Sequence, residues 1–497
     1  MSAGGLKGAF FRTVHGPHHH WWALGVTSIG TFMTAYDLTA VSISLPQIMT
    51  DFRASLTSTS WVVLAFLLTT TILLLPAGYL GDRVGRKKVY NLGFVISGAG
   101  SLLCGLSRDP TQLIVFRVLQ AVGGAMLQTN SFAIVSAIFP DRERGKGLGL
   151  GSTVAAIGAT AGPALGGFIV SAVGWRGVFF VSSLAGLIGI VLGRLVLLEK
   201  RVSTSGGRPA GRLDLGGIGI SAVAVGCLLV GLSLGQEEGW SSWSTLFFLG
   251  SSGIAMIVFP LYEAQRENPL VDVQLFRIRA FAYNNVARLI CFISLTASTL
   301  LMPFFLQLVL GYSAARAGML IAPMSLVMAP VAAASGWLTD RMGSRVLSSV
   351  GMAVITLSLV MLSRLDPASG ASDVLWPTML MGLGLGIFQT PNNTTVMDSV
   401  PRKQFGMASG MLSLVRQGGQ AMGIAMGSTI VAVSLFSAVG KVSLYDLKRG
   451  NPAVLGGGEG VIALANAIDL AFVAAALLSA VGLAFCLLQG KSARGAS

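Results

Sequence analysis

The sequence predicts an all-α integral membrane protein with fourteen transmembrane helices, arranged as two six-helix bundles of parallel repeat plus an inserted helix pair. Three observations predict this fold. Hydrophobic stretches follow one another along most of the chain, basic residues concentrate in alternate loops, and sequence motifs recur at a nearly constant offset. Hydrophobic residues make up 53% of the chain and charged residues 11%, a balance that suits helices packed in lipid and excludes a soluble enzyme.

Each expected span has roughly the 20 residues that a helix needs to cover the hydrocarbon core of a bilayer. The expected spans are residues 21–46, 58–80, 89–107, 112–138, 147–172, 177–198, 215–234, 244–262, 281–308, 316–338, 346–363, 374–397, 407–437 and 463–488.

The net charge of +14 is distributed in a way that indicates a membrane protein and no nucleic-acid partner. Of the 34 Lys and Arg residues, 22 lie in loops on the side of the N-terminus and 8 in the opposite loops. Because basic loops remain in the cytoplasm, we expect a multi-pass protein of the cell membrane with both termini cytoplasmic. Four arginines fall within spans, namely Arg117, Arg194, Arg288 and Arg416.

We expect no cofactor, no metal and no disulfide. All four cysteines lie inside apolar spans and show no metal-ligand spacing. His18, His19 and His20 precede Trp21 and Trp22, where an anchor at the membrane interface is favoured over a metal site.

Internal repeats divide the chain into two halves. The segment GYLGDRVGRKK, beginning at Gly78, returns as GWLTDRMGSRV at Gly336, an offset of 258 residues. Six spans precede residue 200 and six follow residue 280, so the two spans between them preserve orientation and the halves form a parallel repeat. The expected segments are a cytoplasmic tail (1–20), an N-terminal bundle (21–198), a linker (199–214), the inserted helices (215–263), a second linker (264–280), a C-terminal bundle (281–488) and a tail (489–497).

Several motifs carry a family resemblance. The segment Gly78 to Lys88 resembles the loop signature between helices two and three of the major facilitator superfamily. Arg117 in LIVFRVLQAVGGA resembles the fourth-helix motif of that superfamily, although Ala121 stands where glycine is usual.

Two further motifs point to exporters. GATAGPALGG, residues 158–167, is similar to the fifth-helix motif of exporters in this superfamily. Asp37 in YDLTAVSISLP resembles the first-helix signature of the fourteen-helix drug:proton antiporter-2 family, of the multidrug efflux type. The resemblance covers nearly the whole chain. It implies the superfamily fold, alternating access and proton-driven export.

Asp37 and Arg117 are the candidate proton-coupling residues. Both fall within the membrane, where an unpaired charge costs a few kcal/mol or more, so we expect them to meet. Either they form a static ion pair that locks helices one and four, or proton occupancy of Asp37 is coupled to opening. Their repeat counterparts are Ser294 and Thr378, and this asymmetry favours function over scaffold.

The charged loop motif is expected to act as a conformational latch at the ends of the helices; the alternative is a topology determinant that works by positive charge alone. The candidate latch residues are Gly78, Asp82, Arg83, Gly85, Arg86, Asp340, Arg341 and Gly343.

The glycines of the fifth helix recur at four-residue spacing and therefore line one face. In exporters of the resembled kind this face closes the interface between the halves, whereas simple helix packing is the alternative. The antiporter-motif residues are Gly158, Gly162, Pro163, Gly166 and Gly167.

If the resemblance holds, helices one, four, nine and twelve line a large, mostly apolar substrate cavity. The two arginines among its residues serve either to bind an anionic substrate group or to link helices. The candidate cavity residues are Met33, Tyr36, Gln120, Gln128, Asn130, Tyr283, Asn284, Arg288, Gln307, Gln389, Asn392, Asn393 and Arg416.

These observations together predict a monomeric, proton-coupled efflux antiporter that partners the lipid bilayer, protons and a small lipophilic substrate, cations included. Export of a native lipid or secondary metabolite by the same mechanism is the alternative. A membrane-embedded transferase or a passive channel fits the residues less well. The long loop of residues 438–462 is either a tether or a hairpin over the exit.

Overall fold

The computed structural model describes residues 19–140, 143–199, 214–266, 273–401, 405–439 and 459–489, which are almost entirely helical. The expected N-terminal tail up to residue 18, most of the linker of residues 199–214, most of the long loop of residues 438–462 and the C-terminal tail from residue 490 lie outside the described residues.

The first half of the chain forms six long helices joined by short turns. They are α2 (His19–Phe52), α3 (Leu56–Val84), α4 (Arg86–Leu106), α5 (Pro110–Ile138), α6 (Arg144–Val173) and α7 (Arg176–Val196).

Two helices follow before the second half, which repeats the long-helix pattern with one extra break. The two are α9 (Leu215–Glu237) and α10 (Trp243–Glu263). The second half comprises the 3-10 turn η1 (Val273–Arg277), α11 (Arg279–Phe304), the π-turn η2 (Phe305–Val309), α12 (Ala314–Ile321), α13 (Pro323–Met342), α14 (Ser344–Leu362), α15 (Ala371–Asp398), α16 (Phe405–Val439) and α18 (Glu459–Leu488).

Local sequence explains where the helices begin and end. The side chain of Asp109 accepts a hydrogen bond from Gln112 N at 2.8 Å, and Pro110 follows as the first residue of α5. Gly85 ends α3 with a φ of 114°, and Gly343, its counterpart in the repeat, ends α13 with a φ of 81°. Glycine adopts positive φ without a steric penalty, so both repeats use it for the same sharp turn.

Thirteen helical segments within the described residues are long and apolar enough to cross a membrane, judged by length and composition. The expected span of residues 21–46 lies in α2, which is not among them. Helix α2 carries many hydroxyl side chains, and those of Thr27, Thr31 and Ser44 bond to carbonyls three or four residues earlier. These hydroxyl groups can be buried among other helices at little cost because their hydrogen bonds are made within α2 itself.

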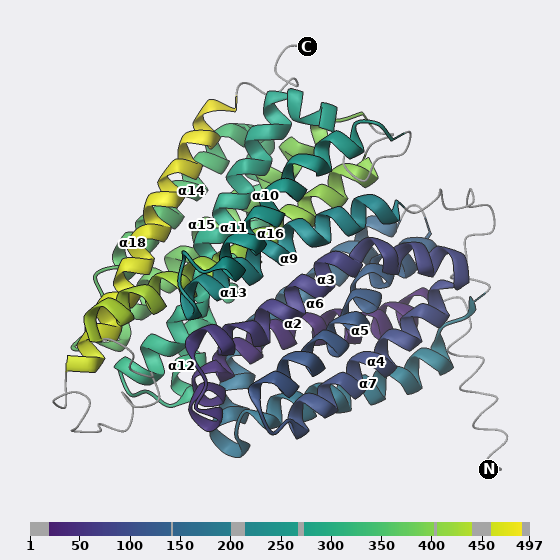
Figure 1. Cartoon of the computed structure of the whole chain (residues 1–497). Coiled ribbons are helices and arrows are strands. Elements are labelled where there is room, and N and C mark those ends of the chain that lie inside the picture. Colours follow the sequence, from purple (N-terminus) through teal and green to yellow (C-terminus); the bar gives the residue numbers. More distant parts are fainter. Residues whose placement is uncertain are drawn as a thin grey trace.

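The two halves form separate bundles that touch along one side (Figure 1). Helix α6 packs against α12 and α13, α3 packs against α16, and α2 packs against α11 and α12. Helix α9 contacts α3 and α16, one helix from each half, and α10 packs on α9.

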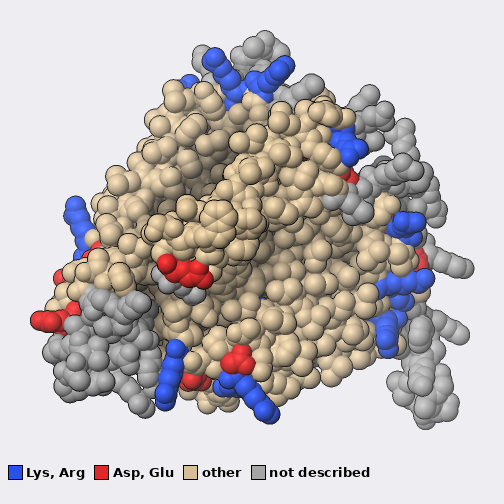
Figure 2. Space-filling model, in the orientation of Figure 1, with Lys and Arg blue, Asp and Glu red and all other residues tan. Residues whose placement is uncertain are grey.

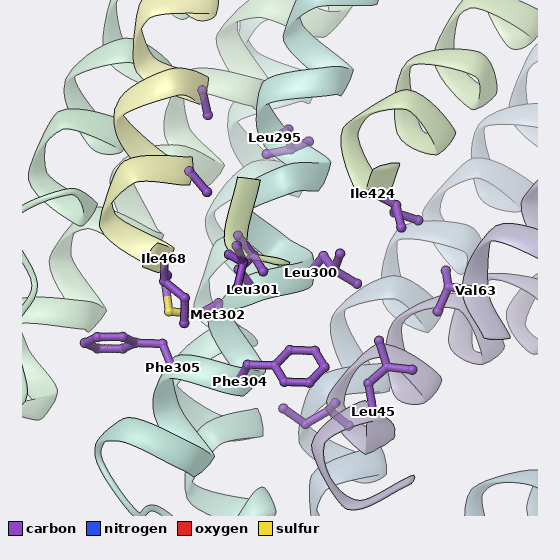
Figure 3. Close-up of a cluster of buried hydrophobic side chains, with 14 of the residues drawn as sticks. Leu45, Val63, Leu295, Leu300, Leu301, Met302, Phe304, Phe305, Ile424 and Ile468 are labelled. Carbon is purple, nitrogen blue, oxygen red and sulfur yellow. The ribbon is translucent and has the colours of Figure 1, made fainter. Parts of the chain in front are cut away.

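For orientation, we call the end of the bundles at residues 52–56 the far end and the end at residues 84–86 the basic end. Contacts between the halves gather toward the far end, where Gln307 Nε2 donates to the carbonyl O of Ile43 at 3.0 Å. Ala315 N donates to Ser171 Oγ at 3.0 Å. The largest buried apolar cluster also crosses between the halves, with Leu45 near Phe304 (Figure 3).

The surface carries the apolar belt that a bilayer requires. Much of the face shown in Figure 2 is uncharged, and most charged side chains lie around its edges. Large hydrophobic side chains stay exposed on many helices; Trp243, for example, is 82% exposed and Val173 70%. So much exposed apolar surface on a folded chain indicates contact with lipid.

Candidate functional site

Asp37 lies in the interior of the first half, only 1% exposed. Its Oδ2 accepts a hydrogen bond from Gln120 Nε2 of α5 at 2.8 Å, and its Oδ1 accepts one from the hydroxyl of Ser182 in α7. Three helices therefore converge on one carboxyl group, and the acid faces the protein rather than the lipid.

Arg117 is fully buried on α5 and is held by neutral partners. Its Nε donates to the carbonyl O of Val62 at 2.9 Å, and its Nη1 donates to Gln120 Oε1 at 2.7 Å. The guanidinium also lies over the ring of Phe66, 4.3 Å from its centroid.

The expected direct contact between Asp37 and Arg117 is replaced by a bridge. No ion pair within 4.0 Å joins them among the described residues; instead, the amide of Gln120 accepts from Arg117 and donates to Asp37. Gln120 lies three residues after Arg117 on the same face of α5, so its side chain reaches between the two charges. Gln120, expected to line the cavity, belongs to this network instead.

The chemistry of the donors orders this network. A guanidinium only donates, so the oxygen of Gln120 faces Arg117 and its NH₂ group faces Asp37. Ser101 Oγ accepts a second bond from the same NH₂ group at 2.7 Å. Asp37 Oδ2 therefore accepts from Gln120, and the Ser182 hydroxyl can donate to Oδ1 when the carboxyl group is ionised. The Ser182 hydroxyl can rotate and accept when Asp37 carries a proton.

A second polar network forms in the other half around Arg288, which is 4% exposed. Its Nε donates to the carbonyl O of Leu412 at 3.0 Å, and its Nη1 donates to the side-chain oxygen of Asn393. Asn392 Nδ2 bonds to the carbonyl O of Asn284 at 2.9 Å. The structure thus brings together four of the expected cavity residues, from α11 and α15.

Other expected cavity residues are spread over different surroundings. Met33 packs in an apolar cluster with Tyr90 and Phe94 inside the first half, and Tyr283 packs edge-on against Phe485 of α18 at 5.7 Å between ring centroids. Both side chains therefore pack against helices of their own bundle.

The remaining expected cavity residues differ in their partners. Asn130 Nδ2 bonds to the carbonyl O of Met126 at 2.9 Å, and Gln307 links the two halves. Tyr36 is buried with a hydroxyl that has no hydrogen-bond partner among the described residues. Gln128, Gln389 and Arg416 are partly exposed.

The loop motif makes its contacts within the first half. Arg86 bonds to Asp82 Oδ1 through Nη2 at 2.8 Å and through Nε at 2.9 Å, and its Nη1 donates to the carbonyl O of Ala133 in α5 at 3.1 Å. Arg83 is exposed, and Arg341 in the second copy stacks on Trp337. The side chain of Asp340 lies outside the described part of the structure.

The glycine stripe faces a helix of its own half and not the interface between the halves. A methyl group on Gly158 would meet the backbone of Phe32, and one on Gly162 or Gly166 would collide with Thr39 or Ala40, all on α2 of the same half. The stripe therefore brings α6 close to α2, and the second copy brings α16 close to α11 in the same way.

Two other residues of the motif, Pro163 and Gly167, contact α12 of the other half. A methyl group on Gly167 would collide with the carbonyl O of Ala314, and one on Gly318 with the carbonyl O of Pro163. The close approach that was expected of the stripe thus belongs to Gly167 and Pro163, which point away from α2 toward α12.

Sequence reasoning did not single out Ser182, Ser101 or Asp469. A serine in a helix gives no signal of its own, because its hydroxyl usually bonds to its own backbone. Asp469 did carry a signal, since it is the one acid in the interior of α18, ten residues after Glu459 at the start of the helix, and α18 is the most apolar of the thirteen segments. One of its carboxylate oxygens is buried with no hydrogen-bond partner among the described residues.

Comparison with known proteins identifies the family. Residues 27–424 match the Major Facilitator Superfamily. The chain is 32% identical over 416 residues to the riboflavin transporter RibZ of Clostridioides difficile, covering 84% of this chain and 89% of that protein. It is 33% identical over 412 residues to the multidrug resistance protein Stp of Mycobacterium tuberculosis, covering 82% of this chain and 75% of that protein.

A third relative is named as a resistance and export protein, and a solved structure matches the fold. The tetracenomycin C resistance and export protein of Streptomyces glaucescens is 30% identical over 422 residues, covering 85% of this chain and 77% of that protein. A bacterial homologue of the human lysosomal transporter Spinster, solved in an inward-facing and occupied conformation, matches with a TM-score of 0.73 at 16% identity, covering 97% of this chain and 98% of that chain. Two similar helical bundles, a membrane-facing surface and these relatives together place the chain in the major facilitator superfamily, as a multi-pass membrane transporter and not an enzyme.

Proposed function

We propose that this transporter is a proton-coupled antiporter that exports lipophilic compounds by alternating access. The observation that carries the proposal is the buried Asp37, held by Gln120 and Ser182 from two other helices. Gain or loss of a proton changes which of these bonds the carboxyl group can make. Such a change biases the packing of α2 against α5 and α7.

The proposal includes membership of the fourteen-helix drug:proton antiporter-2 family, with α9 and α10 as the inserted pair. Support comes from the position of α9, which touches one helix of each half. It also comes from the length of α2, which is sufficient for a fourteenth span beside the thirteen apolar segments. Its 34 residues extend about 50 Å at 1.5 Å per residue, more than the thickness of the hydrocarbon core. We place both termini in the cytoplasm because loops on the side of the N-terminus hold 22 Lys and Arg residues and the opposite loops hold 8.

In this orientation the far end is external, and the contacts between the halves close it. The conformation is then inward-facing. The pair formed by Asp82 and Arg86 lies within the first half, and we propose that Asp82 latches the opposite, outward-facing state through contacts made only there. Similarity to a protein named as a multidrug resistance protein and to one named as a tetracenomycin C resistance and export protein supports lipophilic drugs as substrates.

Similarity to a protein named as a riboflavin transporter favours a second candidate, export of a native metabolite or lipid by the same mechanism. Whole-cell profiling against drugs, flavins and lipids separates the two substrate classes.

The test uses purified protein in proteoliposomes with an imposed proton gradient. The parent protein should accumulate a lipophilic dye against its gradient. Asp37→Asn should lose this uphill accumulation while retaining exchange of labelled for unlabelled dye, since exchange needs no net proton movement. Uphill transport by Asp37→Asn at the parent rate would show that Asp37 is not the coupling acid.

A further inference from the structure

The second half holds two arginines on facing helix surfaces within the membrane. Gly419 and Gly423 of α16 lie against Leu289 and Ile293 of α11, which identifies the faces that meet. Arg416 lies three residues before Gly419 and therefore shares that face of α16.

Arg288 approaches the same face of α16 from the other side. Its Nε bonds to the carbonyl O of Leu412, one helical turn before Arg416. Residues four apart on a helix have Cβ atoms roughly 6 Å apart, so the two guanidinium groups are near neighbours. Two like charges in such positions repel each other.

Neither arginine is neutralised by a carboxylate among the described residues. The partners of Arg288 are a backbone carbonyl and asparagine side chains, which are neutral. Arg416 makes no hydrogen bond or ion pair within the described part of the chain and is partly exposed. Two adjacent cations in a membrane interior are costly without an anion, which makes the pair a candidate anion-binding site.

The residue that follows Arg416 reaches the contact between the two halves. Gln417, next to Arg416, accepts hydrogen bonds from Thr70 and Thr71 of α3, each at 3.3 Å. The Nε2 of Gln417 and the Oε1 of Gln420 are buried without a partner in the described structure. A molecule bound beside Arg416 would therefore lie one residue from a contact between the two halves.

We propose that Arg288 and Arg416 bind the anionic group of an amphiphilic substrate, such as a carboxylate, sulfonate or phosphate. This inference rests on the proposed transport function and specifies the charge of the cargo. Guanidinium groups bind such oxyanions through paired hydrogen bonds, and Arg416 has its donors available. Asp37 offers no accessible site for a cationic substrate in this structure because it is only 1% exposed inside the first half.

Binding measurements test the proposal without requiring transport. The parent protein in phosphatidylcholine nanodiscs is titrated with three probes that share one ring system: pyrenesulfonate, pyrenemethanol and pyrenemethylammonium, with empty nanodiscs subtracted. We expect the sulfonate to bind at least about tenfold more tightly than the alcohol, in the range that a hydrogen bond to a charged group supplies. Equal affinity for the sulfonate and the alcohol, or tighter binding of the ammonium probe, would overturn the inference.

Variants at Arg416 locate the site. Arg416→Gln should weaken sulfonate binding about tenfold or more and leave alcohol binding unchanged, whereas Arg416→Lys should retain most of the preference. Arg194→Gln, which removes an exposed arginine from α7, is the matched control and should leave both affinities unchanged. An equal loss of sulfonate and alcohol binding in Arg416→Gln would indicate a packing defect and contradict the proposal.

Nanodiscs with added phosphatidylglycerol distinguish a lipid headgroup from a free anion. If the lipid occupies the site, it should weaken sulfonate binding to the parent but not the residual binding to Arg416→Gln. If no lipid competition appears, the free amphiphile is the ligand; both results support an anion site. If the protein shows no preference for the sulfonate but still transports a neutral dye on a proton gradient, only this inference is overturned. If it binds the sulfonate but shows no proton-driven transport, only the proposed function is overturned.

Discussion

The Nε2 of Gln120 donates a hydrogen bond to the Oδ2 of Asp37 at 2.8 Å, across the contact between α5 and α2. Because the oxygen of the same amide accepts from Arg117, the position of one side chain sets the surroundings of two buried charges. A shift of α2 against α5 breaks the bond to Asp37 while the bond to Arg117, which lies within α5, survives. The contact is therefore suited to report helix movement to the acid.

Replacing Gln120 with Met should remove both bonds while keeping a similar volume. We expect the free energy of unfolding to fall by about 1–3 kcal/mol, because a buried carboxylate and a buried guanidinium each lose a partner. The measurement is thermal unfolding in detergent, combined with uphill transport in proteoliposomes. Gln128→Met, on the same helix but partly exposed, is the control for the unfolding measurement alone. Unchanged stability of the Gln120 variant would show that the bridge contributes nothing to the fold.

Replacing Gly167 with Val should prevent the far end from closing, because the new side chain would collide with Ala314 across the interface between the halves. Closure is measured by crosslinking cysteines placed at Ser171 and Ala315, whose hydrogen-bonding atoms are 3.0 Å apart. We expect a several-fold slower crosslinking rate and a loss of transport.

Gly149→Val is the control for this variant, because a methyl group at Gly149 in the same helix meets no atom within 4 Å. It should crosslink and transport like the parent. Unimpaired crosslinking in Gly167→Val would contradict the role assigned to this contact.

Replacing Gly162 with Leu should act differently, since Gly162 faces Thr39 and Ala40 of the same half. We expect reduced stability of the first half, by about 1–3 kcal/mol for an overpacked contact, rather than a selective defect in closure. Thermal unfolding in detergent measures the change. A variant that keeps the parent unfolding temperature but fails to close would instead restore the gating role expected from the motif.

Replacing Asp82 with Asn should leave stability almost unchanged, because the pair with Arg86 is partly exposed and such pairs contribute about 0–1 kcal/mol. If Asp82 latches the outward-facing state, transport should fall by several-fold or more. Arg108→Gln, an exposed charge removed at the far end, is the control. Parent-like transport in Asp82→Asn would leave the motif as a determinant of topology alone.

Replacing Gly343 with Ala should destabilise the protein by about 1–3 kcal/mol through backbone strain alone, since its φ of 81° and ψ of 146° are adopted almost only by glycine and a methyl group would meet no atom within 4 Å. Gly253→Ala isolates the effect, because Gly253 also has open space but lies inside α10. That change should be neutral or stabilising by up to about 1 kcal/mol. Equal effects in the two variants would mean that the turn tolerates a side chain.

The arrangement of the helices was largely predictable from the sequence. The hydrophobic stretches, the 22 to 8 division of basic residues and the repeated motifs predicted a multi-pass helical protein of duplicated design. The expected span of residues 21–46 corresponds to a long helix whose composition alone does not mark it as a span. Its hydroxyl groups bond within the helix, and composition does not register that compensation.

The candidate site was predictable only in part. The burial of Asp37 and Arg117 followed from their positions within apolar spans, but the bridge through Gln120 did not. The neutral partners of Arg288 were not predictable either. They come from α15 and α16, more than a hundred residues along the chain, and the sequence does not show which distant side chains will meet.

By itself, the sequence determined which residues share a face of each helix, because side-chain spacing along a helix is periodic and local. Only the tertiary structure decided which helix each face meets. The glycines of α6 turn toward α2, Gly167 turns toward α12, and Met33 and Tyr283 pack inside their own bundles. The physical reason is that an apolar or small-residue face can pack against any complementary face, and the choice depends on how all the helices fill space together.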